Sequence, residues 1–170
     1  MKILLKNPVV ILMALIPAVA SALYIPILGF AVKDIYLWKI PIVRPLEHIS
    51  VLGIAMLVGA VIGWGFVGAY FAKKRASIWQ GILIAHIIPI VCTVLYSIFG
   101  IIGTLGDSET LKTAGDLIGV LGMGFFNTVG TYVYMITPVK FFEIYLDLIV
   151  MGGIFAIGYA IKMSRGAKRK

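Results

Sequence analysis

Hydrophobic residues fall into five long runs that short polar stretches separate. The runs cover about residues 8–32, 49–72, 78–103, 117–137 and 141–161. A helix needs roughly 20 mainly apolar residues to cross a bilayer, and each run is near that length. Because open sheet edges cannot be satisfied in lipid, the pattern predicts an all-α fold. We expect residues 1–170 to form a single integral membrane domain, a polytopic helical bundle of four or five spans.

The polar stretches between the runs also have a characteristic composition. Residues 33–50 combine charges and prolines with Tyr36 and Trp38, which are typical of a loop lying at the membrane–water interface. The first run begins like a secretory signal, with Ala20-Ser21-Ala22 in the position of a cleavage site. Since the apolar run continues to Val32, we expect it to be a retained span.

The overall composition agrees with a membrane protein. Apolar residues make up 61% of the chain and charged residues 13%, and the mean hydropathy is +1.07, far from the values of a soluble domain. The net charge of +8 comes from Lys and Arg near the ends of the runs, where they orient helices and meet anionic lipid head groups. We therefore expect the lipid bilayer as a partner, and no nucleic acid.

The distribution of basic residues leaves two topologies open. The positive-inside rule places the N-terminus, the Lys73-Lys74-Arg75 cluster and the basic C-terminal tail in the cytoplasm of a prokaryotic cell. Five spans cannot satisfy all three, because an odd number of crossings separates the termini. Four spans can, if residues 117–137 form a re-entrant, broken or surface-packed segment that protein or a water-filled cavity covers.

Small residues recur at every fourth position in three of the runs, which lets helix backbones approach closely in lipid. This spacing predicts either packing within one bundle or a surface for a second copy or a partner subunit. The residues concerned are Ala14, Ala18 and Ala22 in the first run, Ala55, Gly59 and Gly63 in the second, and Gly152 and Ala156 in the fifth.

Polar side chains inside the runs are the candidates for a ligand or ion path. His86, Thr93 and Ser97 share one face of the third run, and Asn127 and Thr131 share one face of the fourth. A histidine within a membrane span can bind a cation or relay protons, since it titrates near physiological pH. The alternative is a neutral histidine that donates one hydrogen bond to a neighbouring helix.

The fifth run carries two carboxylates, Glu143 and Asp147, on one helical face. Glu143 can pair with Lys140 at head-group level, whereas Asp147 lies about 10 Å beyond that lysine along the helix. An ionised aspartate at this depth must be paired, hydrated or protonated. We therefore expect Asp147 to be either a cation or proton site, with His86 nearby in one of the topologies, or a hydrated structural residue.

Three classes of function remain after a search for catalytic motifs. The chain has no nucleophile elbow, H-E-x-x-H motif, P-loop or dinucleotide fingerprint, so an enzyme is disfavoured. Its single cysteine, Cys92, rules out a cysteine-based metal site, and we expect neither a metal nor a cofactor. The first hypothesis is a small transporter, or a membrane component of a transport system, for a small solute or cation. The alternative is a non-catalytic accessory, assembly or protective subunit that packs against a partner.

Overall fold

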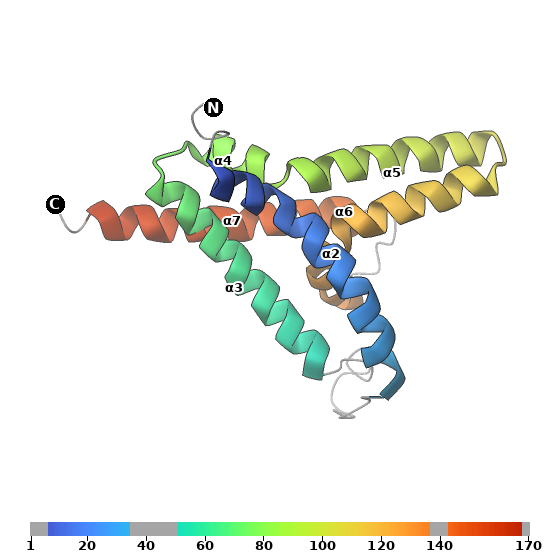
Figure 1. Ribbon diagram of the computed structural model, residues 1–170, viewed down its shortest axis with the longest axis horizontal. Helices are drawn as coiled ribbons and strands as arrows, with labels where there is room; N and C mark the ends of the chain where they lie inside the picture. Colours follow the sequence, from blue (N-terminus) through green and yellow to red (C-terminus); the bar gives the residue numbers. More distant parts are fainter. Residues whose placement is uncertain (1–6, 35–50, 137–142, 168–170) are drawn as a thin grey trace.

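The computed structural model describes residues 7–34, 51–136 and 143–167, with side chains placed for 7–23, 55, 57–126 and 145–166. This part of the chain is helical and contains no strand, which confirms the all-α prediction. Figure 1 shows the helices, which are α2 (Pro8–Asp34), α3 (Val51–Lys73), α4 (Ile78–Ala85), α5 (Ile87–Leu105), α6 (Glu109–Ile136) and α7 (Glu143–Ala167).

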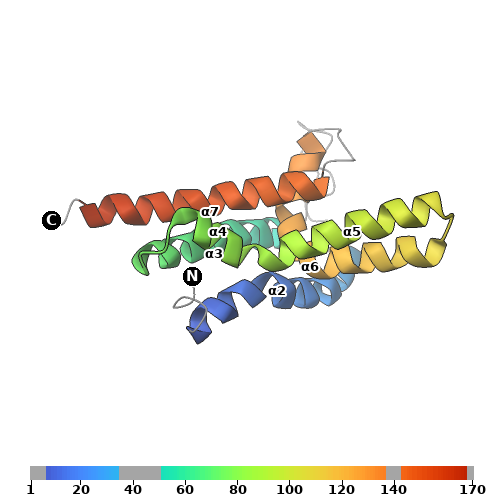
Figure 2. The same cartoon turned by 90° about the horizontal axis from the view of Figure 1, so that it is seen from above.

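In both views α7 extends from one end of the molecule to about its middle (Figures 1 and 2), and it contacts α3, α4, α5 and α6. α3 crosses beside α7, α2 packs on α6, and α5 and α6 form an antiparallel hairpin that extends beyond the other helices. The turn after α3 and the end of α7 lie at one end of the molecule, and the α5–α6 turn lies at the other. The two ends therefore carry different loops: one is rich in Lys and Arg, and the other contains Asp107 and Glu109.

Two helices in the described residues are long and apolar enough to cross a membrane, Ile87–Leu105 and Tyr145–Gly166. Two further apolar stretches, Pro8–Leu23 and Leu57–Lys73, are shorter. The count of four or five spans is therefore not confirmed. The expected interfacial loop lies mostly outside the described residues, except that α2 continues through Asp34.

The third hydrophobic run is not one helix, contrary to the sequence-based expectation. It is divided at His86, which ends α4 and precedes α5 with φ −107° and ψ 8°. Pro89 then lies in the first turn of α5, where a backbone N–H would have no hydrogen-bond partner within the helix. The break therefore comes before the proline and brings the His86 side chain to the junction of two helices.

One alternative for the fourth run was a re-entrant or broken segment. The structure differs from it, because α6 is uninterrupted from Glu109 to Ile136 and shows no re-entrant break. The polar residues between the third and fourth runs, 104–116, mostly belong to the ends of α5 and α6. Glu109 lies in the first turn of α6, where a negative charge stabilises the helix dipole, and its carboxylate bonds Lys112 Nζ at 2.8 Å.

α3 and α7 cross closely, and glycine makes this crossing possible. A Cβ at Gly68 would overlap the backbone oxygen of Phe155, and a Cβ at Gly158 would overlap the backbone of Gly65. The absence of these side chains lets the two helix backbones come into direct contact.

The small residues selected from the sequence lie elsewhere. Ala55, Gly59 and Gly63 are on the exposed side of α3. A Cβ at Gly59, Gly63 or Gly152 would meet no atom within 4 Å. Gly68 is five residues beyond Gly63, about 140° further around the helix, so the close crossing uses a different face. In the remaining positions Ala22 is exposed, Ala18 and Ala156 are half-buried, and Ala14 packs against the core.

Candidate functional site

His86 lies at the centre of the described core and is 2% exposed. The Trp64 indole N–H donates to His86 Nε2 at 3.1 Å, and His86 Nδ1 lies 2.9 Å from the Ile82 carbonyl oxygen. An indole N–H can only donate, so Nε2 must accept and the proton must be on Nδ1. This hydrogen-bond pattern assigns a neutral imidazole, with both ring nitrogens bonded to groups of the same chain.

Aromatic rings enclose the histidine from three further helices. The His86 ring lies 5.3 Å from the ring of Trp64 on α3, 5.4 Å from that of Phe126 on α6 and 5.8 Å from that of Phe155 on α7. Trp64 also packs edge-on against Phe126 at 5.0 Å. We call Trp64, His86, Phe126 and Phe155 the aromatic cluster. It joins α3, the α4–α5 junction, α6 and α7 through one contiguous set of rings.

Local sequence explains how these rings reach the centre. Residues 60, 64, 67 and 71 of α3 are buried, which is the spacing of one helical face. α4 begins with a capping box in which Ser77 and Gln80 exchange side-chain and backbone hydrogen bonds. This cap fixes the start of the short helix, and eight residues later the chain reaches the junction where His86 sits.

A second group of polar residues lies between α5 and α7. Ser97 Oγ lies 2.5 Å from the hydroxyl oxygen of Tyr145 and donates to the Thr93 carbonyl at 2.8 Å. Thr93 is 3% exposed, and its hydroxyl has no hydrogen-bond partner among the described residues. Asp147 is fully buried and lies two residues after Tyr145. Thr93, Ser97 and Asp147 are thus all within about one helical turn of the same α5–α7 contact.

Asp147 also shares a face of α7 with two core residues. Met151 and Phe155 follow at intervals of four, and all three side chains are 0% exposed. The side-chain hydrogen bonds of His86 go to Trp64 and Ile82. The backbones of Asn127 and Thr131 are part of α6, but their side chains lie outside the described residues.

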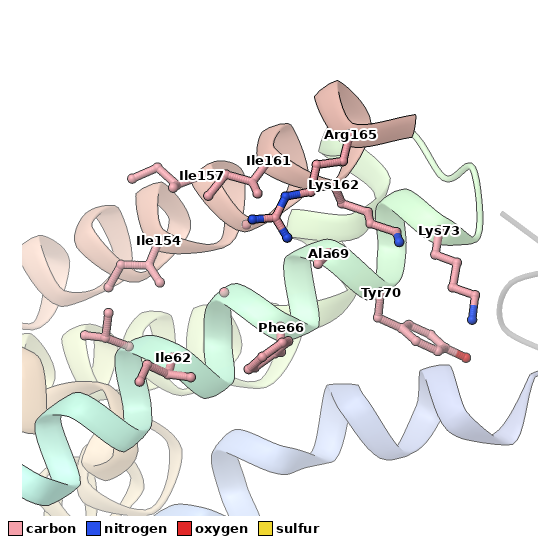
Figure 3. Close-up of a pocket in the computed structure, with 13 residues that line it drawn as sticks. Ile62, Phe66, Ala69, Tyr70, Lys73, Ile154, Ile157, Ile161, Lys162 and Arg165 are labelled. Carbon is pink, nitrogen blue, oxygen red and sulfur yellow. The ribbon is translucent and has the colours of Figure 1, made fainter. Parts of the chain in front are cut away.

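An open apolar groove of about 620 Å³ lies apart from these groups, between α3 and α7. Figure 3 shows that isoleucines from both helices line it and that Lys162 and Arg165 lie at one end. The α3 side is formed by Val61, Ile62, Gly65, Phe66, Ala69, Tyr70 and Lys73, and the α7 side by Ile154, Ile157, Gly158, Ile161, Lys162 and Arg165. None of the candidates for a ligand path is among these residues.

No known protein family, curated protein or solved structure matches the chain. Within the described residues, no group of three or more His, Cys, Asp or Glu side chains could hold a metal ion. The chemistry of the site therefore rests on the aromatic cluster, the buried α5–α7 polar residues and the α3–α7 groove.

Trp64 and Tyr145 are the polar partners that sequence reasoning missed. A tryptophan in the middle of an apolar helix carries one N–H that needs an acceptor when the ring is buried. His86 is one of two histidines in the chain, which made it a natural candidate for that acceptor. Tyr145, at the start of the last helix, gave no comparable signal because its hydroxyl could equally face water.

Proposed function

We propose that this chain is an integral membrane protein that acts as an accessory subunit, packing against a partner in the bilayer. The observation that carries the proposal is the state of His86. Its ring is enclosed by three aromatic side chains, and both of its nitrogens are already bonded within the chain. A cation at Nε2 would have to displace the Trp64 N–H, which favours a structural role for His86, one of the candidate path residues.

The outer surface supports the membrane part of this proposal. On α5, side chains at eight positions are large, apolar and exposed: Ile87, Val91, Val94, Leu95, Ile98, Ile101, Ile102 and Leu105. A contiguous apolar surface of this kind is typical of contact with lipid or with another protein. Because this surface belongs to a hairpin that extends beyond the other helices (Figure 1), it offers a partner helix access from several sides.

Site-specific photo-crosslinking in native membranes tests the accessory role. A photoreactive residue is placed in turn at 94, 98, 101 and 105 on one side of α5, and at 93 as the buried control. A partner predicts one cross-linked species of constant mass from a set of positions three or four residues apart, and none from 93. Cross-links to lipid alone, here and on the exposed faces of α2, α3 and α7, contradict the proposal.

Transport is the second candidate, and the full burial of Asp147 on α7 favours it. A carboxylate in a membrane interior is costly and is often part of an ion or proton route. On this hypothesis Asp147→Asn, which preserves shape, abolishes proton flux into liposomes carrying a pH-sensitive dye, whereas Glu143→Gln has much less effect. Equal flux in Asp147→Asn and the unaltered protein identifies the aspartate as structural.

A further inference from the structure

We infer that the α3–α7 groove is a binding site for one anionic phospholipid, with acyl chains along its apolar length and the phosphate at its basic end. The inference rests on the membrane location in the proposed function, but not on the accessory role. It assigns a ligand class to a surface that contains none of the candidate path residues.

The apolar part of the groove has the shape of a chain-binding surface. Gly65 and Gly158 lie where α3 and α7 cross, and neither contributes a side chain to fill the groove. A Cβ at Gly65 would meet no atom within 4 Å, so the groove is open at that point. Along α3 the lining extends from Val61 to Lys73, twelve residues or about 18 Å at 1.5 Å per residue. Half of a bilayer's hydrocarbon core is about 15 Å thick, so this length suits an acyl chain from one leaflet.

The charged part of the groove selects the sign of the head group. Lys73, Lys162 and Arg165 are all at one end, and none of the described residues that line the groove is acidic. Figure 3 shows the Arg165 guanidinium reaching back over the groove near Ala69, whereas the Lys162 amine lies on the side toward Tyr70 and Lys73. None of these three cations forms an ion pair with another described residue. A phosphate is an acceptor that guanidinium and ammonium groups bind well.

Tyr70 stands at the same end, where an aromatic ring with a polar tip suits the membrane interface. Lys74 Nζ lies 5.5 Å from the centre of this ring and adds another positive charge nearby. Both helices end at this side, so their basic residues also complement the helix dipoles. If these residues only complemented the helix dipoles, they would stabilise the fold whether or not lipid is present. A lipid site instead predicts stabilisation that depends on the lipid.

Native mass spectrometry and thermal unfolding in a neutral detergent test the inference. The protein is titrated with phosphatidylglycerol or with phosphatidylcholine of the same acyl chains. We expect one phosphatidylglycerol to bind at low concentration and to raise the melting temperature, and phosphatidylcholine to bind at least about tenfold more weakly. Equal binding of the two lipids overturns the inference.

Two pairs of variants locate the site. Lys162→Gln with Arg165→Gln should weaken phosphatidylglycerol binding by about tenfold or more, whereas Lys168→Gln with Arg169→Gln removes the same charge from the same tail and should have little effect. Gly65→Leu should fill the groove and weaken binding, whereas Gly59→Leu adds the same side chain to an open face outside it.

Equal loss of binding in the two charge pairs indicates diffuse attraction and overturns the site. So does unchanged binding in a folded Gly65→Leu protein. A dimer that phosphatidylglycerol does not dissociate, and that Gly65→Leu abolishes, assigns the groove to a second copy and also overturns the inference. The charge comparison stands on its own if Gly65→Leu does not fold. None of these outcomes bears on partner cross-linking from α5, so the two proposals fail independently.

Discussion

Glycine is used in two different ways in the two main helix pairs of this molecule. Between α3 and α7, Gly68 and Gly158 each face backbone atoms of the opposing helix. Between α5 and α6, the nearest atom to each of three α6 glycines belongs to a side chain of α5 instead: Gly115 meets Phe99, Gly119 meets Tyr96, and Gly122 meets Cys92. The outer atoms of a side chain, such as the Tyr96 ring that faces Gly119, can move, but a helix backbone and the Cβ atoms fixed to it can only move as a whole. The α3–α7 crossing should therefore tolerate much less change than the α5–α6 hairpin.

The largest expected effect is at the backbone crossing. Gly158→Ala places a methyl group on the backbone of Gly65, and overpacking of this kind costs about 1–3 kcal/mol or more. The gain in helix propensity from Gly to Ala, about 1 kcal/mol, offsets only part of that loss. We expect a net decrease in the free energy of unfolding, measured by denaturant titration in detergent micelles.

Gly152→Ala on the same helix is the matched control, because its Cβ would meet no atom within 4 Å. It should be neutral or stabilising by up to about 1 kcal/mol. If both substitutions have the same effect, backbone contact does not define the α3–α7 crossing and the comparison between the helix pairs fails.

The next largest effect concerns the hydrogen bond inside the aromatic cluster. Trp64→Phe keeps an aromatic ring but removes the N–H that His86 Nε2 accepts. An unsatisfied buried acceptor costs about 1–3 kcal/mol, so we expect a loss of stability in that range in the same titration. Trp79, which is 76% exposed on α4, supplies the control Trp79→Phe. Comparable losses in the two variants would show that the Trp64–His86 bond contributes nothing specific.

The five apolar runs predicted the helices well, because the length of an apolar run depends only on local composition. Each of the five runs lies largely within helices of the described structure, and the exposed apolar side chains are spread along them. The break at His86 was not predicted, because residues 78–103 form one continuous apolar run in the sequence. In the structure Pro89 lies in the first turn of a new helix, where it fits without loss.

Contacts between helices were harder to predict, since they depend on how each helix is rotated about its axis. A search for small residues at every fourth position selected Gly59 and Gly63, whereas the crossing uses Gly65 and Gly68, three residues apart. His86 was correctly recognised as an unusual polar residue, but its partner Trp64 is 22 residues away on another helix. The Trp64–His86 pair depends on the glycine crossing of α3 and α7 and on the face of α3 that this crossing turns inward. The spacing of residues in the sequence determines neither the crossing nor that face.

A smaller effect is expected in the hairpin, and it tests the contrast between the two pairs directly. The variant is Gly119→Ala. Its Cβ would lie 3.0 Å from Tyr96 Cδ2, an atom of a ring that can shift. The cost of this adjustment should nearly cancel the gain in helix propensity, leaving a change within about 0.5 kcal/mol. A loss as large as that of Gly158→Ala, in the same denaturant titration, would show that side-chain and backbone contacts are equally restrictive here.

The last expected effect is a gain in stability at the two turns, which are alike although they lie at opposite ends of the molecule. Arg75 and Asp107 both have positive φ, 54° and 46°, at the left-handed position that follows a helix. The next residue closes each turn, with Ala76 N–H bonding the Phe71 carbonyl at 3.3 Å and Ser108 N–H bonding the Gly103 carbonyl at 2.8 Å. This is the pattern in which glycine is usually preferred.

Arg75→Gly should therefore stabilise the protein by about 0.5–1 kcal/mol, because glycine adopts positive φ without steric cost and offsets its larger unfolded-state entropy. Asp107→Gly should gain less, since aspartate tolerates this conformation better than arginine does. Lys74→Gly, one residue earlier, lacks the positive φ and should be destabilising. A destabilising Arg75→Gly, in equilibrium unfolding at the same ionic strength, would mean that the arginine side chain stabilises the basic end by more than its backbone strain costs.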